Sequence, residues 1–283
     1  MANENKTRRD ELVALNKEQA QFYDTPHVQR PLNNIMKLWS LLRRRMYFLM
    51  QNSGIWSDVY AFQKEWIGDL NGKKVLDFGC YDGNALSGYL ATNAASYLAV
   101  DLSKPALDRL MQYFENKGIK GARVQCVDVL SKDFTESGFD IIYAEGVLHH
   151  FNPIVVLLPV LSEKLAPGGR IISLDPLQTS LLTRSVRAIY HPFRCDKEWE
   201  WPFTHDTFAV IRKHFTINKI QGVIGYSKWA IPVAFFHKEA AVRLAKYLHG
   251  KDIASAGTER RPLWGCMQVV MCLEKKRDKS SAH

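Results

Sequence analysis

The chain has 283 residues, 46% hydrophobic and 24% charged, which suffices for one α/β domain with insertions and an N-terminal extension. Its net charge of +9 comes from short scattered clusters, which favours a solvated basic surface over a nucleic-acid footprint. Five scattered cysteines, no bilayer-length apolar run and no signal peptide favour a cytoplasmic protein without disulfides, metal sites or transmembrane segments.

The N-terminal residues 1–70 are expected to form helices, with residues 21–24 between them. Within residues 32–50, apolar side chains recur at helical spacing, which predicts a buried face with Arg43–Arg45 largely on the other side. The members of this predicted face are Leu38, Leu41, Leu42, Met46 and Leu49.

The segment 73–84 carries the most information about function. A strand-like run, 74–78, breaks at Gly79, passes a short polar loop and reaches Gly83, after which a helix is expected to begin. Glycine lets a loop approach a ligand and adopt positive φ, and a strand that turns into a helix presents free backbone N–H groups. This pattern predicts a nucleotide-like cofactor site on a doubly wound sheet.

The charge of the loop indicates which cofactor binds there. A dinucleotide fingerprint needs glycine where this chain has Tyr81, and Asp82 adds a carboxylate inside the loop. A diphosphate would therefore meet both bulk and like charge. S-adenosylmethionine has no phosphate, and its sulfonium and ammonium groups favour carboxylates such as Asp77 and Asp82, so it fits better than NAD or FAD.

Three further strands place acidic residues at their ends. The run 96–101 ends in Asp101, whose carboxylate can accept hydrogen bonds from both ribose hydroxyls of an adenosine. The run 123–127 leads to Asp128, which could meet the adenine amino group, and a fourth strand leads to Glu145. The sequence thus predicts a row of carboxylates around an adenosine-type ligand.

These motifs, in this order, resemble those of class I S-adenosylmethionine-dependent methyltransferases. The resemblance covers about residues 70–175 and includes Val147-Leu148-His149-His150 and Ala166-Pro167-Gly168-Gly169 before a strand. It implies a Rossmann-like, doubly wound, mostly parallel seven-stranded sheet whose last strand is antiparallel, with the cofactor across its carboxyl edge. Tyr81 departs from the pattern, because many members have glycine there.

The resemblance also implies a domain organisation. Residues 1–70 form a helical extension that closes over the cofactor, and residues 71–283 form the catalytic domain with insertions at about 176–203 and 225–262. The expected cofactor contacts are Asp77, Gly79, Cys80, Tyr81, Asp82, Gly83, Asp101, Leu102, Asp128, Val129, Glu145 and, from the extension, Tyr23.

The first insertion is expected to bind the methyl acceptor. A helix over 181–189 separates apolar from mixed faces, and the following segment 190–203 interleaves aromatic residues with charges and prolines, as in an apolar pocket. The aromatic residues could instead only anchor the insertion. The expected acceptor contacts are His150, Arg187, Tyr190, Arg194, Trp199 and Trp201, whose arginines admit a phosphorylated or carboxylated acceptor.

The second insertion contains a basic helix with Lys238, Arg243 and Lys246. Such a helix can close over a site, contact another subunit or lie on a membrane surface.

Methyl transfer from a sulfonium requires alignment with the acceptor and exclusion of water, and a base helps when the acceptor must lose a proton. The candidates are His149, which we favour over His150, together with Glu145 and Asp175. We therefore expect a methyltransferase that acts on a small, largely apolar metabolite and releases S-adenosylhomocysteine. The alternatives are an RNA methyltransferase, a lipid- or membrane-associated methyltransferase, a dinucleotide-dependent redox enzyme and a non-catalytic binding module.

Overall fold

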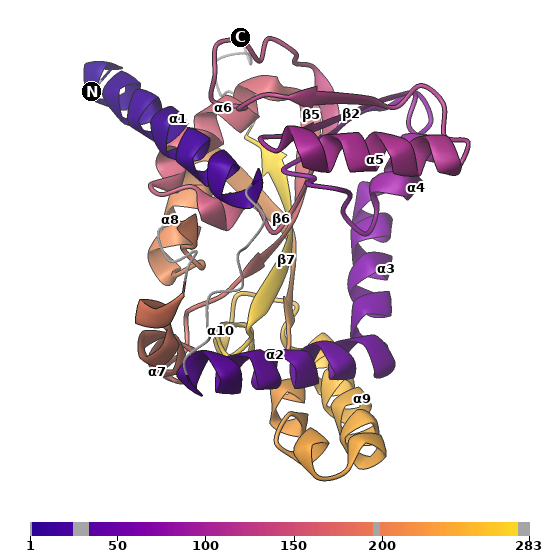
Figure 1. Ribbon diagram of the computed structural model, residues 1–283, viewed down its shortest axis with the longest axis vertical. Coiled ribbons are helices and arrows are strands. Elements are labelled where there is room, and N and C mark those ends of the chain that lie inside the picture. The colour runs from indigo at the N-terminus through magenta and orange to yellow at the C-terminus, as the bar shows by residue number, and fades with distance from the viewer. Residues whose placement is uncertain (1, 25–33, 195–198, 277–283) are drawn as a thin grey trace, which may run out of the picture.

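The computed structural model describes residues 2–24, 34–194 and 199–276, except for the side chains of residues 2–6, 22 and 23. Its centre is a seven-stranded sheet in the order β3-β2-β1-β4-β5-β7-β6, in which β7 runs antiparallel to both neighbours and the other pairs are parallel (Figure 1). The strands are β1 Lys74–Phe78, β2 Ser96–Asp101, β3 Arg123–Cys126, β4 Phe139–Glu145, β5 Leu165–Pro176, β6 Phe215–Val223 and β7 Gln268–Lys275. The expected fold class is confirmed.

Helices cover both faces of this sheet. The α-helices are α1 Ala2–Asp24, α2 Asn34–Asn52, α3 Ile55–Ile67, α4 Ser87–Asn93, α5 Lys104–Asn116, α6 Leu157–Lys164, α7 Leu181–Tyr190, α8 His205–His214, α9 Lys238–Ser255 and α10 Arg261–Trp264. Short 3-10 helices are η1 Leu148–His150, η2 Ile154–Val156, η3 His191–Phe193, η5 Ser227–Ala230 and η6 Val233–Phe235. Residues 21–24, expected between helices, belong to α1.

Apolar side chains that point alternately to the two faces of the strands build a separate hydrophobic core on each face of the sheet. Leu76 and Phe78 of β1 pack with α6 and α8 on one face, whereas Val75 of the same strand packs with α3, α4 and α5 on the other. Successive side chains of a strand point to opposite faces, and a parallel sheet covered on both sides needs apolar residues on each. The doubly wound arrangement follows from this pattern.

Helix α2 crosses the lower end of the sheet in Figure 1, with α9 packed beyond it. Leu49 of α2 is buried with Ala230, Ala241 and Ala245 in a small cluster that joins α2 to η5 and α9. Leu38 is 57% exposed, so the prediction that it belongs to a buried face is wrong. Leu38 lies about three turns before Leu49 in α2 and is not part of the cluster with η5 and α9 that buries Leu49.

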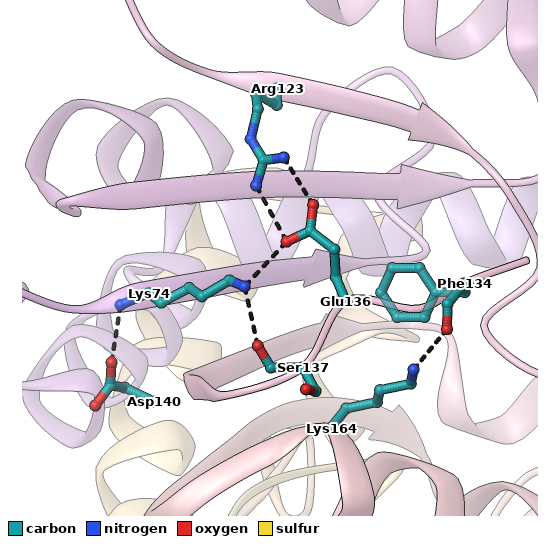
Figure 2. Close-up of polar contacts among 7 residues, drawn as sticks. All are labelled: Lys74, Arg123, Phe134, Glu136, Ser137, Asp140 and Lys164. Carbon is teal, nitrogen blue, oxygen red and sulfur yellow. Dashed lines mark hydrogen bonds and ion pairs between the residues drawn. The ribbon is translucent and has the colours of Figure 1, made fainter.

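A charged cluster ties together the amino-terminal ends of several strands (Figure 2). Glu136 accepts hydrogen bonds from Arg123 at 2.7 and 3.2 Å and lies 3.0 Å from the Nζ of Lys74. The Arg123 hydrogen bond, with the nearby Lys74, lowers the pKa of Glu136 from 4.5 to about 2. The cluster stands at the edge of the sheet opposite the carboxyl ends of the strands.

Candidate functional site

The loop after β1 passes close to the loop after β4. Gly79 has φ 65°, and a Cβ there would lie 2.3 Å from Cγ2 of Val147, so no larger residue fits without rearrangement. Tyr81 also has a positive φ of 48°, and its backbone N–H donates to Oδ2 of Asp101 at 2.8 Å. The loop therefore keeps a left-handed residue where many methyltransferases have glycine, at some cost in backbone strain.

Asp77, the fourth residue of β1, holds this loop through hydrogen bonds. Its carboxylate is fully buried and accepts hydrogen bonds from Asn84 at 3.0 Å, Ser87 at 2.5 Å and Tyr97 at 2.7 Å. Burial raises the pKa of Asp77, and the three hydrogen bonds oppose that rise. Asp77 does not line the cavity described next but braces the loop through these hydrogen bonds, and its contact with a ligand stays a prediction.

A cavity of about 270 Å³ lies at the carboxyl ends of β1, β2 and β4. Its described lining includes the carboxylates of Asp101, Asp128 and Glu145 and contains no lysine or arginine. We call it the acidic cavity. The expected site residues found in its lining are Gly79, Tyr81, Asp101, Leu102, Asp128, Val129, Glu145 and His150.

Each of the three carboxylates has a protein partner. Asp101 also accepts the N–H of Ser103 at 2.9 Å, and this serine caps the N-terminus of α5. Asp128 accepts the N–H of Leu130 at 2.8 Å, and Glu145 accepts the hydroxyl of Tyr143 at 2.6 Å. Burial raises the pKa of all three carboxylates, against these hydrogen bonds. The cavity thus concentrates negative charge that a cationic ligand would neutralise.

Three other expected cofactor contacts lie outside the lining of the acidic cavity. Cys80 is fully buried, and Asp82 is exposed on the outer side of the loop, where it pairs with Arg109 at 3.3 Å. Gly83 lines an outer hollow together with Asp82. After the positive φ at Tyr81, Asp82 and Gly83 lie outside the acidic cavity, so their contact with the cofactor, like that of Cys80, stays a prediction. The side chain of Tyr23 lies outside the described part of the chain.

Helix α1 supplies a wall of the acidic cavity that the sequence did not assign. Asn16, Gln19 and Ala20 belong to the lining, and the amide of Asn16 donates to Oδ2 of Asp128 at 2.8 Å. The side chain of Arg9 donates to the carbonyl of Leu130 at 2.6 Å. These polar residues recur on one face of a helix, and that spacing is the signal that could have revealed them.

The two histidines after β4 have different surroundings. His149 is buried, and its Nδ1 lies 3.0 Å from Oδ1 of Asp175, which is also buried. His150 lines the acidic cavity, with its Nδ1 2.5 Å from the carbonyl oxygen of Trp199 and 3.1 Å from the amide nitrogen of Gln19. The carbonyl oxygen of Trp199 accepts and the amide nitrogen of Gln19 donates, so the two contacts require opposite roles of Nδ1, which can serve only one of them at a time.

A second, mostly apolar cavity of about 360 Å³ lies beside the carboxyl ends of β5 and β6. We call it the apolar chamber. Residues of α2, α7 and η5 line it, together with Leu177 after β5 and Ile224 after β6. Arg187 and Tyr190 are in this lining, as the prediction of acceptor contacts requires, and Trp39 stacks on Tyr190 with centroids 3.9 Å apart. Burial lowers the pKa of Arg187.

The remaining expected acceptor contacts do not line this chamber, and His150 lines the acidic cavity instead. Trp201 lines a neighbouring cavity that shares Arg187, and its backbone N–H donates to the carbonyl of His149 at 2.8 Å. Arg194 forms an ion pair with Glu200. The structure therefore brings Arg187 and Tyr190 together, whereas Trp199 and Trp201 hold the segment against the two histidines.

A methyltransferase-domain family model matches residues 48–216, more than half of the chain. The chain belongs to the class I S-adenosylmethionine-dependent methyltransferase family.

Individual relatives of this methyltransferase share about a third or less of its residues over the aligned region. It is 31% identical to an uncharacterized protein of Haemophilus influenzae over 188 residues, which cover 65% of this chain and 68% of that one. It is 33% identical to an uncharacterized methyltransferase of Mycobacterium bovis over 95 residues, 34% of this chain and 46% of the relative. A solved S-adenosylmethionine-dependent methyltransferase of Mesorhizobium loti shares the fold, with a TM-score of 0.51 at 17% identity over 78% of this chain and 97% of that one.

The acidic cavity fits the cofactor of this methyltransferase family. S-adenosylmethionine is positively charged at its sulfonium and ammonium groups and has no phosphate. A described lining with three carboxylates and no lysine or arginine is complementary to that charge and opposes a diphosphate. The cavity also lies at the topological switch of the sheet, between β1 and β4, where ligands of open α/β folds bind.

Proposed function

We propose that the protein transfers a methyl group from S-adenosylmethionine to a small, largely apolar molecule held in the apolar chamber. The observation that carries this proposal is the pair of cavities at one edge of the sheet. One is acidic and lies at the ends of β1, β2 and β4, and the other is apolar and lies at the ends of β5 and β6. Glu145 ends β4, next to β5, and so stands between them.

The residues of the acidic cavity suggest how the cofactor would be held. Asp101 would accept hydrogen bonds from the ribose hydroxyls, and Asp128 with Asn16 would contact the adenine. Glu145 and Gly79 would lie near the amino acid portion. The bound cofactor supplies an already activated methyl group, so the chain's contribution is to orient the acceptor and exclude water.

An acceptor that must lose a proton needs a nearby base. Glu145 and His150 line the acidic cavity, whereas His149 lies behind it in contact with Asp175. Burial raises the pKa of Glu145, and a base whose pKa lies closer to neutrality accepts a proton more readily. We therefore infer that Glu145 or His150 serves as base and that His149 positions this turn.

The experiment is a screen of metabolite and lipid extracts with S-adenosylmethionine labelled in its methyl group, followed by mass spectrometry of the labelled product. The expected product is a methylated apolar small molecule. A Met46→Trp variant, which fills the chamber from α2, should lose at least about tenfold of this labelling while its cofactor affinity stays within about twofold. Labelling of RNA instead, or labelling unchanged in Met46→Trp, would contradict the proposal.

A further inference from the structure

Helix α7 turns apolar side chains toward solvent. Leu181 is 80% exposed and Ile189 64% exposed, and Phe193 of the adjoining η3 is also exposed. The buried residues of α7 are Thr183 and Tyr190. An amphipathic helix of a globular protein normally packs its apolar stripe on the core, and contiguous exposed apolar residues mark an interaction surface.

The exposed apolar surface continues onto two neighbouring elements. Trp39 of α2 stacks on Tyr190 of α7, and Leu38 beside it is exposed. Trp229 of η5 is exposed and lines the apolar chamber together with Leu182 of α7. We call this surface the docking face; its apolar members are Leu38, Leu181, Leu182, Val186, Ile189, Phe193 and Trp229.

The docking face carries exposed positive charge. The three segments that build it are 34–52, 176–194 and 225–236, and none of them contains aspartate or glutamate. Their exposed cations are Lys37, Arg43, Arg44 and Arg184, whereas Arg194 pairs with Glu200 and Arg187 and Lys228 line the apolar chamber. Apolar side chains that insert at the acyl boundary, with cations that meet lipid headgroups, are the requirements for a helix that lies in a membrane interface.

We propose that the docking face binds peripherally to an anionic lipid bilayer, with α7 lying in the interface. No helix in the described ranges is long and apolar enough to cross a membrane, so the contact is with one surface. Leu182, Val186 and Trp229 belong both to the docking face and to the lining of the apolar chamber. On the proposed function, the chamber would therefore open toward the bilayer and receive its acceptor from it.

The proposed membrane contact lies on α7 and not on α9, the basic helix that the sequence suggested. The basic helix α9 buries Ala241 and Ala245 in the cluster with Leu49 and Ala230, so one of its faces is already occupied by protein. Helix α9 also carries acidic residues, whereas α2 and α7 carry none.

The test is flotation of the full chain with vesicles of phosphatidylcholine, alone or mixed with phosphatidylglycerol. The expected result is binding to the mixed vesicles, weakening as salt rises because headgroup attraction is screened. An Arg44→Glu/Arg184→Glu variant should bind them at least about tenfold more weakly. A Lys120→Glu/Lys132→Glu variant, with the same change in net charge at exposed residues of other elements, should bind like wild type.

A second variant, Leu181→Ser/Ile189→Ser/Phe193→Ser, should also lose vesicle binding while keeping cofactor affinity by calorimetry, because none of the three side chains lines the acidic cavity or the apolar chamber. Absence of wild-type binding to the mixed vesicles would overturn the proposal, as would equal loss in the two charge variants. A wild-type dimer that the serine variant converts to a monomer, without vesicle binding, would assign the face to a second copy instead. None of these results depends on methyl transfer, so failure here leaves the proposed function standing.

Discussion

Replacement of Asp101 with alanine is expected to weaken cofactor binding strongly. Its carboxylate lines the acidic cavity and accepts hydrogen bonds from the N–H groups of Tyr81 and Ser103, which leave lone pairs for the ribose hydroxyls. A hydrogen bond to a charged group contributes roughly 1.5–3 kcal/mol. Since about 1.4 kcal/mol is tenfold in affinity, the dissociation constant should rise about ten- to hundredfold.

The assay is calorimetric titration with S-adenosylhomocysteine, which avoids turnover. The matched control is Asp82→Ala, which removes a carboxylate from the same loop but on its exposed outer side, where it pairs with Arg109. That pair is solvent-exposed, so its loss should change affinity by less than about threefold. Unchanged affinity in Asp101→Ala would remove Asp101 from the ribose role. Equal weakening in both variants would show that the loop, rather than the Asp101 carboxylate, determines affinity.

Two further predictions concern stability. Asp175→Asn should lower the free energy of unfolding by about 1–3 kcal/mol in urea, because it weakens a buried hydrogen bond to His149, yet cofactor affinity should stay within about twofold; a loss like that of Asp101→Ala would place Asp175 in the cofactor site. In Glu136, the fall in pKa from 4.5 to about 2 corresponds to about 3 kcal/mol, and solvent screening at the exposed Arg123 reduces this to about 1–2 kcal/mol. This stability is present above pH 4.5 and is lost as the pH falls toward about 2, so Glu136→Gln should be less stable than wild type at pH 7 and the difference should vanish in acid; a constant difference between pH 7 and pH 2 would refute the cause.

Much of the sheet could be predicted because local pattern and final environment agree. The five-residue run that ends at Phe78 is buried on both faces from Val75 onward, as a central parallel strand must be. The capping residues Ser103 and Thr204 also act locally, because each accepts a hydrogen bond from a backbone N–H three residues later. Such features depend on neighbours within a few positions, which a single sequence displays.

The site was predicted less completely, because the direction of each side chain decides whether that residue lines the acidic cavity. Asp77 shares a strand face with Val75, two residues before it, so the alternation of side chains along the strand places its carboxylate among buried neighbours, where it accepts the hydroxyl of Tyr97. Asp82 points outward because of the backbone conformation at Tyr81, which a sequence with tyrosine at a usual glycine position did not disclose. The contact from Asn16 joins residues 112 positions apart and required the tertiary structure.

The wall that α1 contributes has a consequence for turnover. Its polar contacts reach residues 121, 112 and 131 positions away, through Arg9, Asn16 and Gln19 respectively. Leu12 of the same helix is buried in the core cluster that contains residues of α6 and α8, so apolar packing adds to these hydrogen bonds, which contribute about 1 kcal/mol each. Release of the spent nucleoside past this wall would therefore require both the hydrogen bonds and the packing of Leu12 to open.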